Sequence, residues 1–319
     1  MNGKTLRVIA EGLEAPEGPV ALPDGSILVC EMAAGRVARV RPDGSRRVVA
    51  ETGGTPNGAA MGPDGMCYVC NRGASTWRRL GEMLVPVAHD EPGAGTPRGC
   101  IQRFDPESGR VELLYERAGD LWLSAPNDLV FDTTGGFWFT DFGRMRERSL
   151  DLGSLFYAKA DGSHIHEVRG SFYGPNGVGL SPDGRWLYVA ETFTSQLHRF
   201  EVAGPGEIRF ADAAGFGSPG GHFVGAPGGL SFLDSLAIDS GGYILVANGG
   251  EGRLTVFPPD GGACEHIPMP DFAPTNVCFG GENFTTAYVT LMTTGRLVAM
   301  DWPRPGLPLH FRDAAPALP

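Results

Sequence analysis

A short phrase of polar and apolar positions recurs along the chain. It begins with an acidic or amide residue, continues with small and apolar residues, and reaches a tight turn. Five copies place the turn residue seven positions after the polar one, and a looser sixth copy lacks this spacing. We call the first residues of these copies the leader residues; they are Glu17, Asn57, Asn127, Asn176, Asp234 and Asn276. Copies at irregular spacings of roughly 40 to 70 residues indicate a repeat fold.

Each phrase is followed by runs that are typical of β-strands. In the fourth unit, strands are predicted over 176–181, 185–190, 196–202 and 207–211. Period-two alternation, β-branched and aromatic residues and flanking Gly, Pro and Asp favour strands over helices. Six such units predict an all-β fold, a six-bladed β-propeller with four-stranded blades that occupies residues 1–319 as a single domain.

The ring of blades has to be closed at one point. The segment after Trp302 is rich in proline, which makes a poor strand because proline lacks a backbone donor. Residues 5–10 form a better outer strand, so we expect the N-terminal strand to close the last blade.

The longest interruptions of the pattern fall at equivalent places. In a propeller, the loops after the second strands and the connections between blades return to the mouth where the inner strands begin. Residues 72–99, 142–153 and 212–233 lie at such places, and 72–99 is the largest insertion. Insertions that gather on one face are typical of a binding face, which we expect at the channel mouth.

Composition and charge exclude several classes of function. The net charge of -11 argues against a nucleic-acid partner, which requires a basic face. No apolar run is long enough to span a membrane, and the first residues do not resemble a secretory signal. The six cysteines lack a paired metal or redox pattern, and we interpret them as buried thiols of a cytoplasmic protein.

The leader residues are the candidate chemistry. In a ring, all six start in equivalent places and face one centre, where carboxylates and amides supply hard oxygen ligands. This set favours Ca²⁺, with Mn²⁺, Mg²⁺ and Zn²⁺ as alternatives, although no leader is the His or Cys of a structural zinc site. The alternative is that leaders only satisfy backbone groups at strand starts, and Asn57 and Asn276 are the candidates for such structural roles.

Three further groups of residues are candidates for the mouth. The second strands end in polar residues that we interpret mainly as braces for the leaders, namely Glu31, Asn71, Asp141, Glu191 and Asn248. His222 lies in a glycine-rich segment near the predicted mouth. Aromatic residues offer a lining for the mouth, although packing is the more ordinary role for each of them; they are Trp77, Trp122, Phe142, Tyr173, Phe193, Phe223 and Phe232.

At its leaders the chain resembles the senescence marker protein, gluconolactonase and luciferin-regenerating-enzyme-like family. The resemblance rests on Ala15-Pro-Glu17-Gly-Pro, Pro126-Asn127-Asp128, Gly174-Pro-Asn176-Gly, Asp234-Ser-Leu-Ala-Ile-Asp and Pro274-Thr-Asn276-Val. It implies a six-bladed propeller with one divalent ion in the channel, usually Ca²⁺, and lactone hydrolysis. By matching motif it implies Glu17, Asn176 and Asp234 as metal ligands, Asn127 as a ligand or substrate contact, and Asp128 as a substrate contact.

The resemblance also bears on the substrate. Residues 127–141 are similar to the drug-responsive bacterial lactonases of the same superfamily. Sugar-lactone members often carry an arginine where this chain has Ala125, which argues against a sugar lactone.

Three hypotheses for function follow. The first is a metal-dependent lactonase in which the ion polarises the carbonyl and Asp234 is the general base, with a small lactone or ester as the only expected partner. The second is a phosphotriester or fluorophosphate hydrolase of the diisopropylfluorophosphatase type, which uses a similar Glu/Asn/Asn/Asp set. The third is a non-enzymatic binding propeller in which Ca²⁺ is structural.

Overall fold

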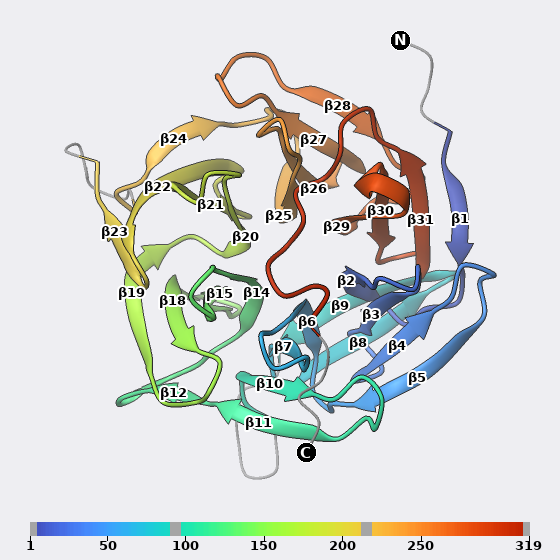
Figure 1. The fold of residues 1–319 in the computed structure, drawn as a ribbon, viewed down its shortest axis with the longest axis horizontal. Coiled ribbons are helices and arrows are strands. Elements are labelled where there is room, and N and C mark those ends of the chain that lie inside the picture. The colour runs from blue at the N-terminus through green and yellow to red at the C-terminus, as the bar shows by residue number, and fades with distance from the viewer. Residues whose placement is uncertain (1–4, 90–96, 212–218, 315–319) are drawn as a thin grey trace.

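The chain folds into a ring of antiparallel sheets around a central channel (Figure 1). The computed structural model describes residues 5–89, 97–211 and 219–314. Within these ranges five blades have four strands each, and the fourth blade carries a fifth strand on its outer edge. The sequence-based prediction of an all-β, six-bladed propeller is therefore confirmed.

The strands occupy equivalent places in each blade. From blade 1 to blade 6, the inner strands are β2 (Pro16–Ala21), β6 (Pro56–Met61), β14 (Pro126–Phe131), β20 (Pro175–Leu180), β25 (Ser231–Ile238) and β29 (Pro274–Gly280). The second strands are β3 (Ile27–Glu31), β7 (Cys67–Asn71), β15 (Gly136–Asp141), β21 (Trp186–Glu191), β26 (Ile244–Gly250) and β30 (Thr286–Leu291). The third strands are β4 (Arg36–Val40), β10 (Cys100–Phe104), β18 (Gly153–Lys159), β22 (Gln196–Gly204), β27 (Arg253–Phe257) and β31 (Arg296–Asp301).

The outer strands complete the blades. They are β5 (Arg46–Glu51), β11 (Val111–Tyr115), β19 (Ile165–Phe172), β23 (Glu207–Arg209) with β24 (His222–Gly225), β28 (Glu265–Pro268) and β1 (Arg7–Ala10). Tight turns join the inner strands to the second strands. Such a turn forms where an aspartate side chain accepts the backbone amide two residues later and the intervening glycine adopts a positive φ. In blade 1, Asp24 Oδ1 accepts the Ser26 amide at 3.0 Å, and Gly25 has a φ of 83°.

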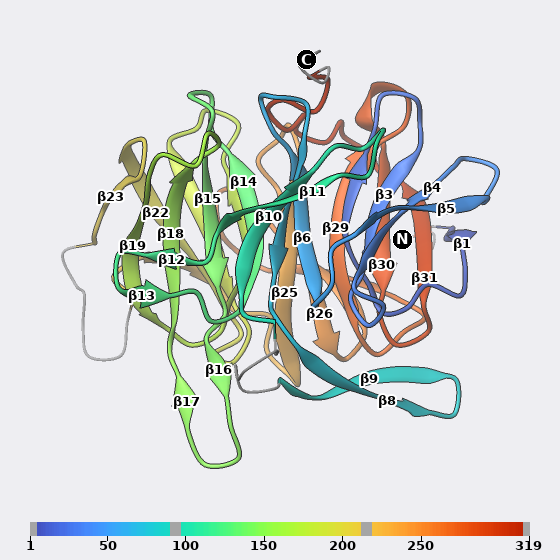
Figure 2. The ribbon, with the colours of Figure 1, turned by 90° about the horizontal axis from the view of Figure 1, so that it is seen from below.

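Short hairpins project from the ring, and two of them mark one of its faces. They are β8 (Ser75–Leu80) with β9 (Met83–His89), β12 (Arg117–Ala118) with β13 (Leu121–Trp122), and β16 (Arg144–Met145) with β17 (Leu150–Asp151), and a 3-10 helix covers Glu282–Phe284. Figure 2 shows β8–β9 and β16–β17 on one face and the C-terminal segment on the opposite face. Insertions 72–99 and 142–153 therefore share a face as predicted, although residues 90–96 lie outside the described ranges.

The third predicted insertion behaves differently. Residues 212–218 lie outside the described ranges, and β24, which follows them, pairs with the outer edge of β22. His222 stands opposite Arg199 and packs its ring edge-on against Trp186 at 5.5 Å, and Phe223 stands opposite His198. The placement of His222 and Phe223 at the mouth was wrong because this glycine-rich segment first completes the outer edge of blade 4.

The N-terminal strand closes the ring. β1 pairs antiparallel with β31, with Arg7 opposite Ala299 and Val8 opposite Val298. Blade 6 therefore combines the first and the last strand of the chain, as the sequence predicted. Ala10, at the end of β1, is buried against the interface between blades 6 and 1.

The hydrophobic core is divided among the interfaces between blades. Six clusters of buried apolar side chains each join two neighbouring blades around the ring. Each sheet therefore buries both faces, which explains why the second strands are mainly apolar on both faces before their polar ends. The cysteines in the described ranges are free thiols, as predicted, and all but Cys264 are buried. No helix there has the length and hydropathy to cross a membrane.

Closure of the ring by β1 predicts a large loss of stability on truncation. Deletion of residues 1–10 should lower the free energy of unfolding by several kcal/mol, because it exposes the edge of β31 and the apolar cluster at Ala10. The matched control is Arg7→Ala, which removes an exposed ion pair with Asp301 and should cost about 1 kcal/mol or less. Urea unfolding measures both, and equal midpoints for the truncated and full-length proteins would contradict the account.

Candidate metal centre

A break in strand register places the leader residues. In every blade the pairing between the inner and second strand shifts by one residue at its mouth end. A bulge of this kind turns side chains out of the ladder and re-aims them. One residue of each inner strand pairs with a residue at or near the end of the second strand, and the next residue along the inner strand occupies the leader position. These paired residues are Pro16, Pro56, Pro126, Pro175, Leu233 and Pro274.

This register corrects the sixth leader. Thr275, directly after Pro274, is equivalent to Glu17 and Asp234, whereas Asn276 lies one position later. Thr275 Oγ1 donates to the Pro16 carbonyl at 2.9 Å and thereby ties blade 6 to blade 1. Asn276 was predicted as a leader because of its residue type, and the pairing of β29 with β30 places it in the following position.

Glu17 lies at the centre of the contacts that join the blades. Asn276 Nδ2 donates to Glu17 Oε2 at 2.8 Å, and the Gly18 amide donates to the same oxygen. Ser235 Oγ lies 3.4 Å from Glu17 Oε1 and 3.5 Å from Asn176 Oδ1. Leader and adjacent residues of blades 1, 4, 5 and 6 therefore meet at one point, as expected for side chains that face a common axis.

The carboxylates of this group are close enough to perturb one another. Burial raises the pKa of the Glu17 carboxyl to about 7, although hydrogen bonds from Asn276 and Gly18 oppose the shift. Burial and the charge of Glu17 raise the pKa of Asp234 well above its usual value, and hydrogen bonding to Asn176 opposes this rise. Glu17 and Asp234 thus lie together in a poorly solvated place, where a bound cation would favour their charged forms.

Asn127 completes the candidate set, and its buried side chain lacks hydrogen-bond partners within the described ranges. Its side chain is fully buried, and neither its amide nitrogen nor its carbonyl oxygen has a hydrogen-bond partner among the described residues. Buried amides without partners are rare and call for an explanation such as a ligand or an ion. Asn57 Oδ1 is in the same situation, while Asn57 Nδ2 contacts Met32 Sδ at 3.2 Å.

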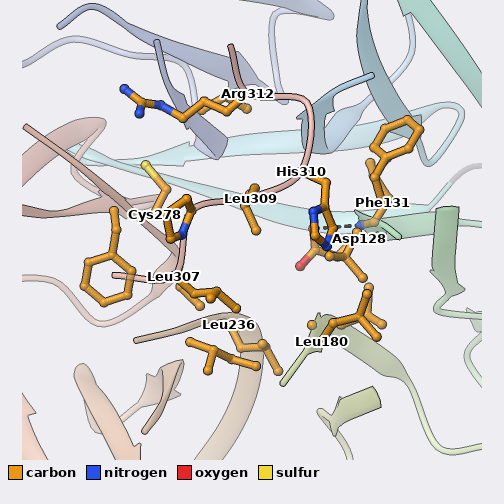
Figure 3. Close-up of a pocket in the computed structure, with 18 of the residues that line it drawn as sticks. Asp128, Phe131, Leu180, Leu236, Cys278, Leu307, Leu309, His310 and Arg312 are labelled. Atoms are coloured by element: carbon orange, nitrogen blue, oxygen red, sulfur yellow. Dashed lines mark hydrogen bonds between the residues drawn. The ribbon is translucent and has the colours of Figure 1, made fainter. Parts of the chain in front are cut away.

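Asp128 lies beside this group and, unlike the four leaders Glu17, Asn127, Asn176 and Asp234, also lines the cavity behind it. Its Oδ1 accepts the Leu129 amide at 2.9 Å, and its side chain lines a cavity behind the leaders (Figure 3). Burial, together with the charge of Glu17, raises the pKa of Asp128 to about 8. The structure therefore brings Asp128 close to Glu17, on the side of the ring away from the mouth.

Glycines after the leaders allow the inner strands to approach closely. A Cβ at Gly18 would lie 2.2 Å from the Asn57 carbonyl oxygen, and one at Gly58 would lie 2.4 Å from Asp128 Oδ1. A Cβ at Gly177 would lie 2.8 Å from the Asp234 carbonyl oxygen. These glycines are therefore required by the narrowness of the ring, which in turn brings the leaders within reach of one another.

The residues that end the second strands act as braces, as interpreted from the sequence. Each of the five accepts a backbone amide from the segment just before a leader: Glu31 from Glu14, Asn71 from Thr55, Asp141 from Ser124 and Ala125, Glu191 from Tyr173, and Asn248 from Phe232. In blade 6, where Leu291 breaks the series, Asp271 accepts the Ala273 amide at 2.7 Å instead. The braces hold the chain at the point where each inner strand begins.

Arg72 is a residue of the site that the sequence analysis missed. It follows directly after β7, and its guanidinium carbon lies 4.7 Å from the centre of the Phe142 ring. Burial lowers the pKa of Arg72, whereas the charges of Asp234 and Glu17 raise it. The sequence signal that could have identified Arg72 is its position directly after the brace residue Asn71, because the chain enters the mouth at that position.

The predicted aromatic lining is only partly formed. Phe142 and Phe193 make an edge-to-face pair with ring centres 5.2 Å apart beside Arg72. Trp77 instead packs partly buried against Ala15 and Met32. Trp122, in β13, is exposed and lies under the Arg98 guanidinium at 4.6 Å.

The donor set fits a hard cation better than a soft one. No group of three or more His, Cys, Asp or Glu side chains placed to hold an ion occurs in the described ranges, so a site here depends on amide oxygens. The unpartnered amide of Asn127 and the neighbouring carboxyls of Glu17 and Asp234 supply such oxygens. Carboxylate and amide oxygens are the ligands of Ca²⁺.

Comparison with known proteins identifies a family. A family model described as "SMP-30/Gluconolactonase/LRE-like region" matches residues 15–293. The chain is 37% identical over 146 residues to lactonase drp35 of Staphylococcus haemolyticus, a match that covers 45% of this chain and 42% of that protein. The chain therefore spans less than half of the length of this curated relative.

Two other relatives match over longer segments. A diisopropyl-fluorophosphatase of Loligo vulgaris is 32% identical over 194 residues, which cover 56% of this chain and 58% of that protein. A 6-deoxy-6-sulfogluconolactonase of Pseudomonas putida is 31% identical over 222 residues, which cover 69% and 72%.

Solved structures share the fold. A gluconolactonase from Xanthomonas campestris superposes with a TM-score of 0.68 at 24% identity and covers 93% of this chain and 89% of that one. The calcium-binding protein regucalcin from Agrobacterium tumefaciens superposes with a TM-score of 0.69 at 19% identity and covers 96% and 98%.

The close approach of the inner strands predicts that a larger residue in place of a glycine there should destabilise the protein. Gly58→Ala should destabilise the protein by about 1 to 3 kcal/mol, because the added methyl group overlaps Asp128 and the Asn127 carbonyl. The matched control is Gly204→Ala, where the added Cβ meets only the Glu207 side chain at 3.7 Å. Thermal unfolding compares the two, and equal stability of both variants would show that the inner strands are not tightly packed.

Proposed function

Because the chain belongs to the SMP-30/gluconolactonase/LRE-like family, we propose that it is a metal-dependent hydrolase that opens lactones. The observation that carries the proposal is the meeting of Glu17, Asn176 and Asp234 at one point, with the unpartnered Asn127 amide as the fourth leader. The relatives named as lactonases support the reaction class. The calcium-binding neighbour supports the ion.

The residues that would hold the ion are the leaders Glu17, Asn127, Asn176 and Asp234. Two carboxylates balance a divalent charge, and the two amides add oxygen ligands without further charge. A Ca²⁺ ion bound there supplies a Lewis acid that polarises the ester carbonyl. Asn276 keeps Glu17 oriented through its hydrogen bond at 2.8 Å, and Ser235 spans Glu17 and Asn176.

Asp234 is our candidate for the general base. Burial and the charge of Glu17 raise its pKa, which makes its carboxylate a stronger proton acceptor than one on the surface. Its side chain is only partly buried, whereas Glu17 is 1% exposed, so Asp234 is the carboxylate that a water molecule can reach. Asn127 lies on the blade 3 side of the same ring, where we propose that it orients the substrate, whereas Asp128 lines the cavity on the other side of the leaders.

At the mouth, the substrate would lie between the guanidinium group of Arg72 and two aromatic rings. Arg72 lies beside the carboxylates, and the Phe142–Phe193 pair provides an apolar wall next to it. This wall and the alanine at position 125 favour a lactone with an apolar or aromatic part over an unsubstituted sugar lactone.

A second candidate function is the hydrolysis of phosphotriesters or fluorophosphates. The Loligo vulgaris relative is named for hydrolysis of diisopropyl fluorophosphate. A carbonyl and a phosphoryl oxygen make similar demands on a Lewis-acid site, so the same residues would serve either reaction.

Activity measurements on variants test the proposal. Glu17→Gln and Asp234→Asn should each lower kcat/KM for lactones at least a thousandfold, because each removes a charge from the ion site and Asp234 is also the base. Asp301→Asn, at an exposed carboxylate, is the matched control and should retain full activity. Lactones and a fluorophosphate should be assayed side by side with and without a chelator.

The outcomes separate the three hypotheses. Lactone turnover that chelation and both variants abolish supports the lactonase. Turnover of the fluorophosphate alone supports the second candidate. A chelator that lowers the melting temperature while no ester is hydrolysed supports a binding propeller, and full lactone turnover in either variant excludes the site described here.

Arg72 allows a test of the ion site that does not depend on turnover. Its positive charge lies near Glu17 and Asp234, so it opposes cation binding between them. Arg72→Gln should therefore bind Ca²⁺ about tenfold more tightly in isothermal titration calorimetry. Arg110→Gln, at an exposed arginine on the outer edge of blade 2, is the control and should not alter the affinity. Weaker binding in Arg72→Gln would contradict the placement of the ion.

A further inference from the structure

A cavity of about 380 Å³ lies in the channel behind the leader residues. We call it the rear chamber. The inner strands line it with Leu129, Phe131, Leu180, Leu236 and Phe279, and the C-terminal segment adds Leu307 (Figure 3). Its volume is within the range of pockets that hold small organic molecules, and its lining is predominantly apolar.

The C-terminal segment forms the outer wall of the rear chamber. Residues 303–312 cross the face of the ring opposite the hairpins β8–β9 and β16–β17 (Figure 2). We call them the strap. The Leu307 amide donates to the Ile238 carbonyl at 2.9 Å, and Arg312 Nε donates to the Ala21 carbonyl at 2.9 Å. The strap is therefore attached to blades 5 and 1, on both sides of the channel.

Further contacts hold the strap in place. The Gly306 amide donates to the Phe284 carbonyl at 2.8 Å, and the Phe311 ring packs edge-on against Phe131 at 5.8 Å. At the base of the strap, Trp302 Nε1 donates to Asp239 Oδ2 at 3.0 Å. A wall with this many fixed points gives the rear chamber a preformed shape rather than a shape that collapses when empty.

The inner end of the chamber is polar. Asp128 and Asn276 line it there, and both are buried. Asn276 also donates to Glu17, so the chamber and the leader residues share a wall but lie on opposite sides of it. The outer end is open beside the strap, where Leu309 is 46% exposed and His310 is also exposed.

We propose that the rear chamber is a second small-molecule site, separate from the lactone site at the mouth. Its chemistry selects a neutral molecule with an apolar ring or chain, which would fill the space between Phe131, Leu180 and Leu307. One hydroxyl or amide group on that molecule would reach Asp128 at the inner end. The proposal does not rest on the proposed hydrolase activity, because the chamber is defined by its own walls.

Fluorescence of the neutral probe N-phenyl-1-naphthylamine tests the proposal. The full-length protein should bind it saturably with one site per chain, because the probe is apolar and carries one N–H group. Leu307→Trp should fill the chamber from the strap and weaken binding at least tenfold. The matched control is Leu113→Trp on the outer strand of blade 2, where the leucine is 56% exposed, and it should bind the probe like the wild type.

Two additions make the result decisive. Leu309→Trp, at the open end, replaces Leu307→Trp if that variant fails to fold, which thermal unfolding would reveal. A saturating lactone should not displace the probe, since the lactone site lies on the other side of the wall. Absence of saturable binding, unchanged affinity in a folded chamber variant, or displacement by the lactone would each overturn the proposal, whether or not the protein hydrolyses lactones.

Discussion

The structure depends on holding three acidic side chains close together on the axis of a propeller. Burial raises the pKa values of Glu17, Asp128 and Asp234, and the charge of Glu17 raises those of Asp128 and Asp234 further. Such an arrangement is unfavourable in itself, because desolvation penalises each charge and the charges repel. It persists because the leaders are fixed by the bulges, by the braces and by the narrowness of the ring. We interpret the negative charge of these carboxylates as the attraction that retains a divalent cation.

The rest of the fold supplies the rigidity that this arrangement requires. Apolar clusters join every pair of neighbouring blades, and the pairing of β1 with β31 makes the ring continuous. Burial on this scale contributes far more than the repulsion of a few carboxylates costs. The two ends of the channel then take different characters. The mouth carries hairpins and Arg72, whereas the rear is narrowed by the strap.

Much of the fold was predictable because its determinants are local. The repeated phrase, the turns and the strand periodicity follow from short segments, and so does the preference for residues 5–10 over the proline-rich tail as the closing strand. The leader set was largely predictable for the same reason, since Glu17, Asn127, Asn176 and Asp234 begin equivalent strands. The bracing role of Asn71 and Asp141 followed from their places at the ends of second strands.

What the sequence did not reveal depends on pairing between distant segments. Thr275 rather than Asn276 is equivalent to the other leaders because of the register between β29 and β30, which residue types do not indicate. His222 and Phe223 lie on an outer edge because blade 4 had an incomplete edge to cover. Arg72 and the strap reach the channel through tertiary contacts alone. The central claim is that the four leaders hold one divalent ion, and a crystal structure of the protein grown with Ca²⁺ tests it most directly. We predict one strong peak within about 2.3–2.6 Å of oxygens of Glu17, Asn127, Asn176 and Asp234; a map with the ion elsewhere, or with none on the axis at saturating Ca²⁺, would contradict the account.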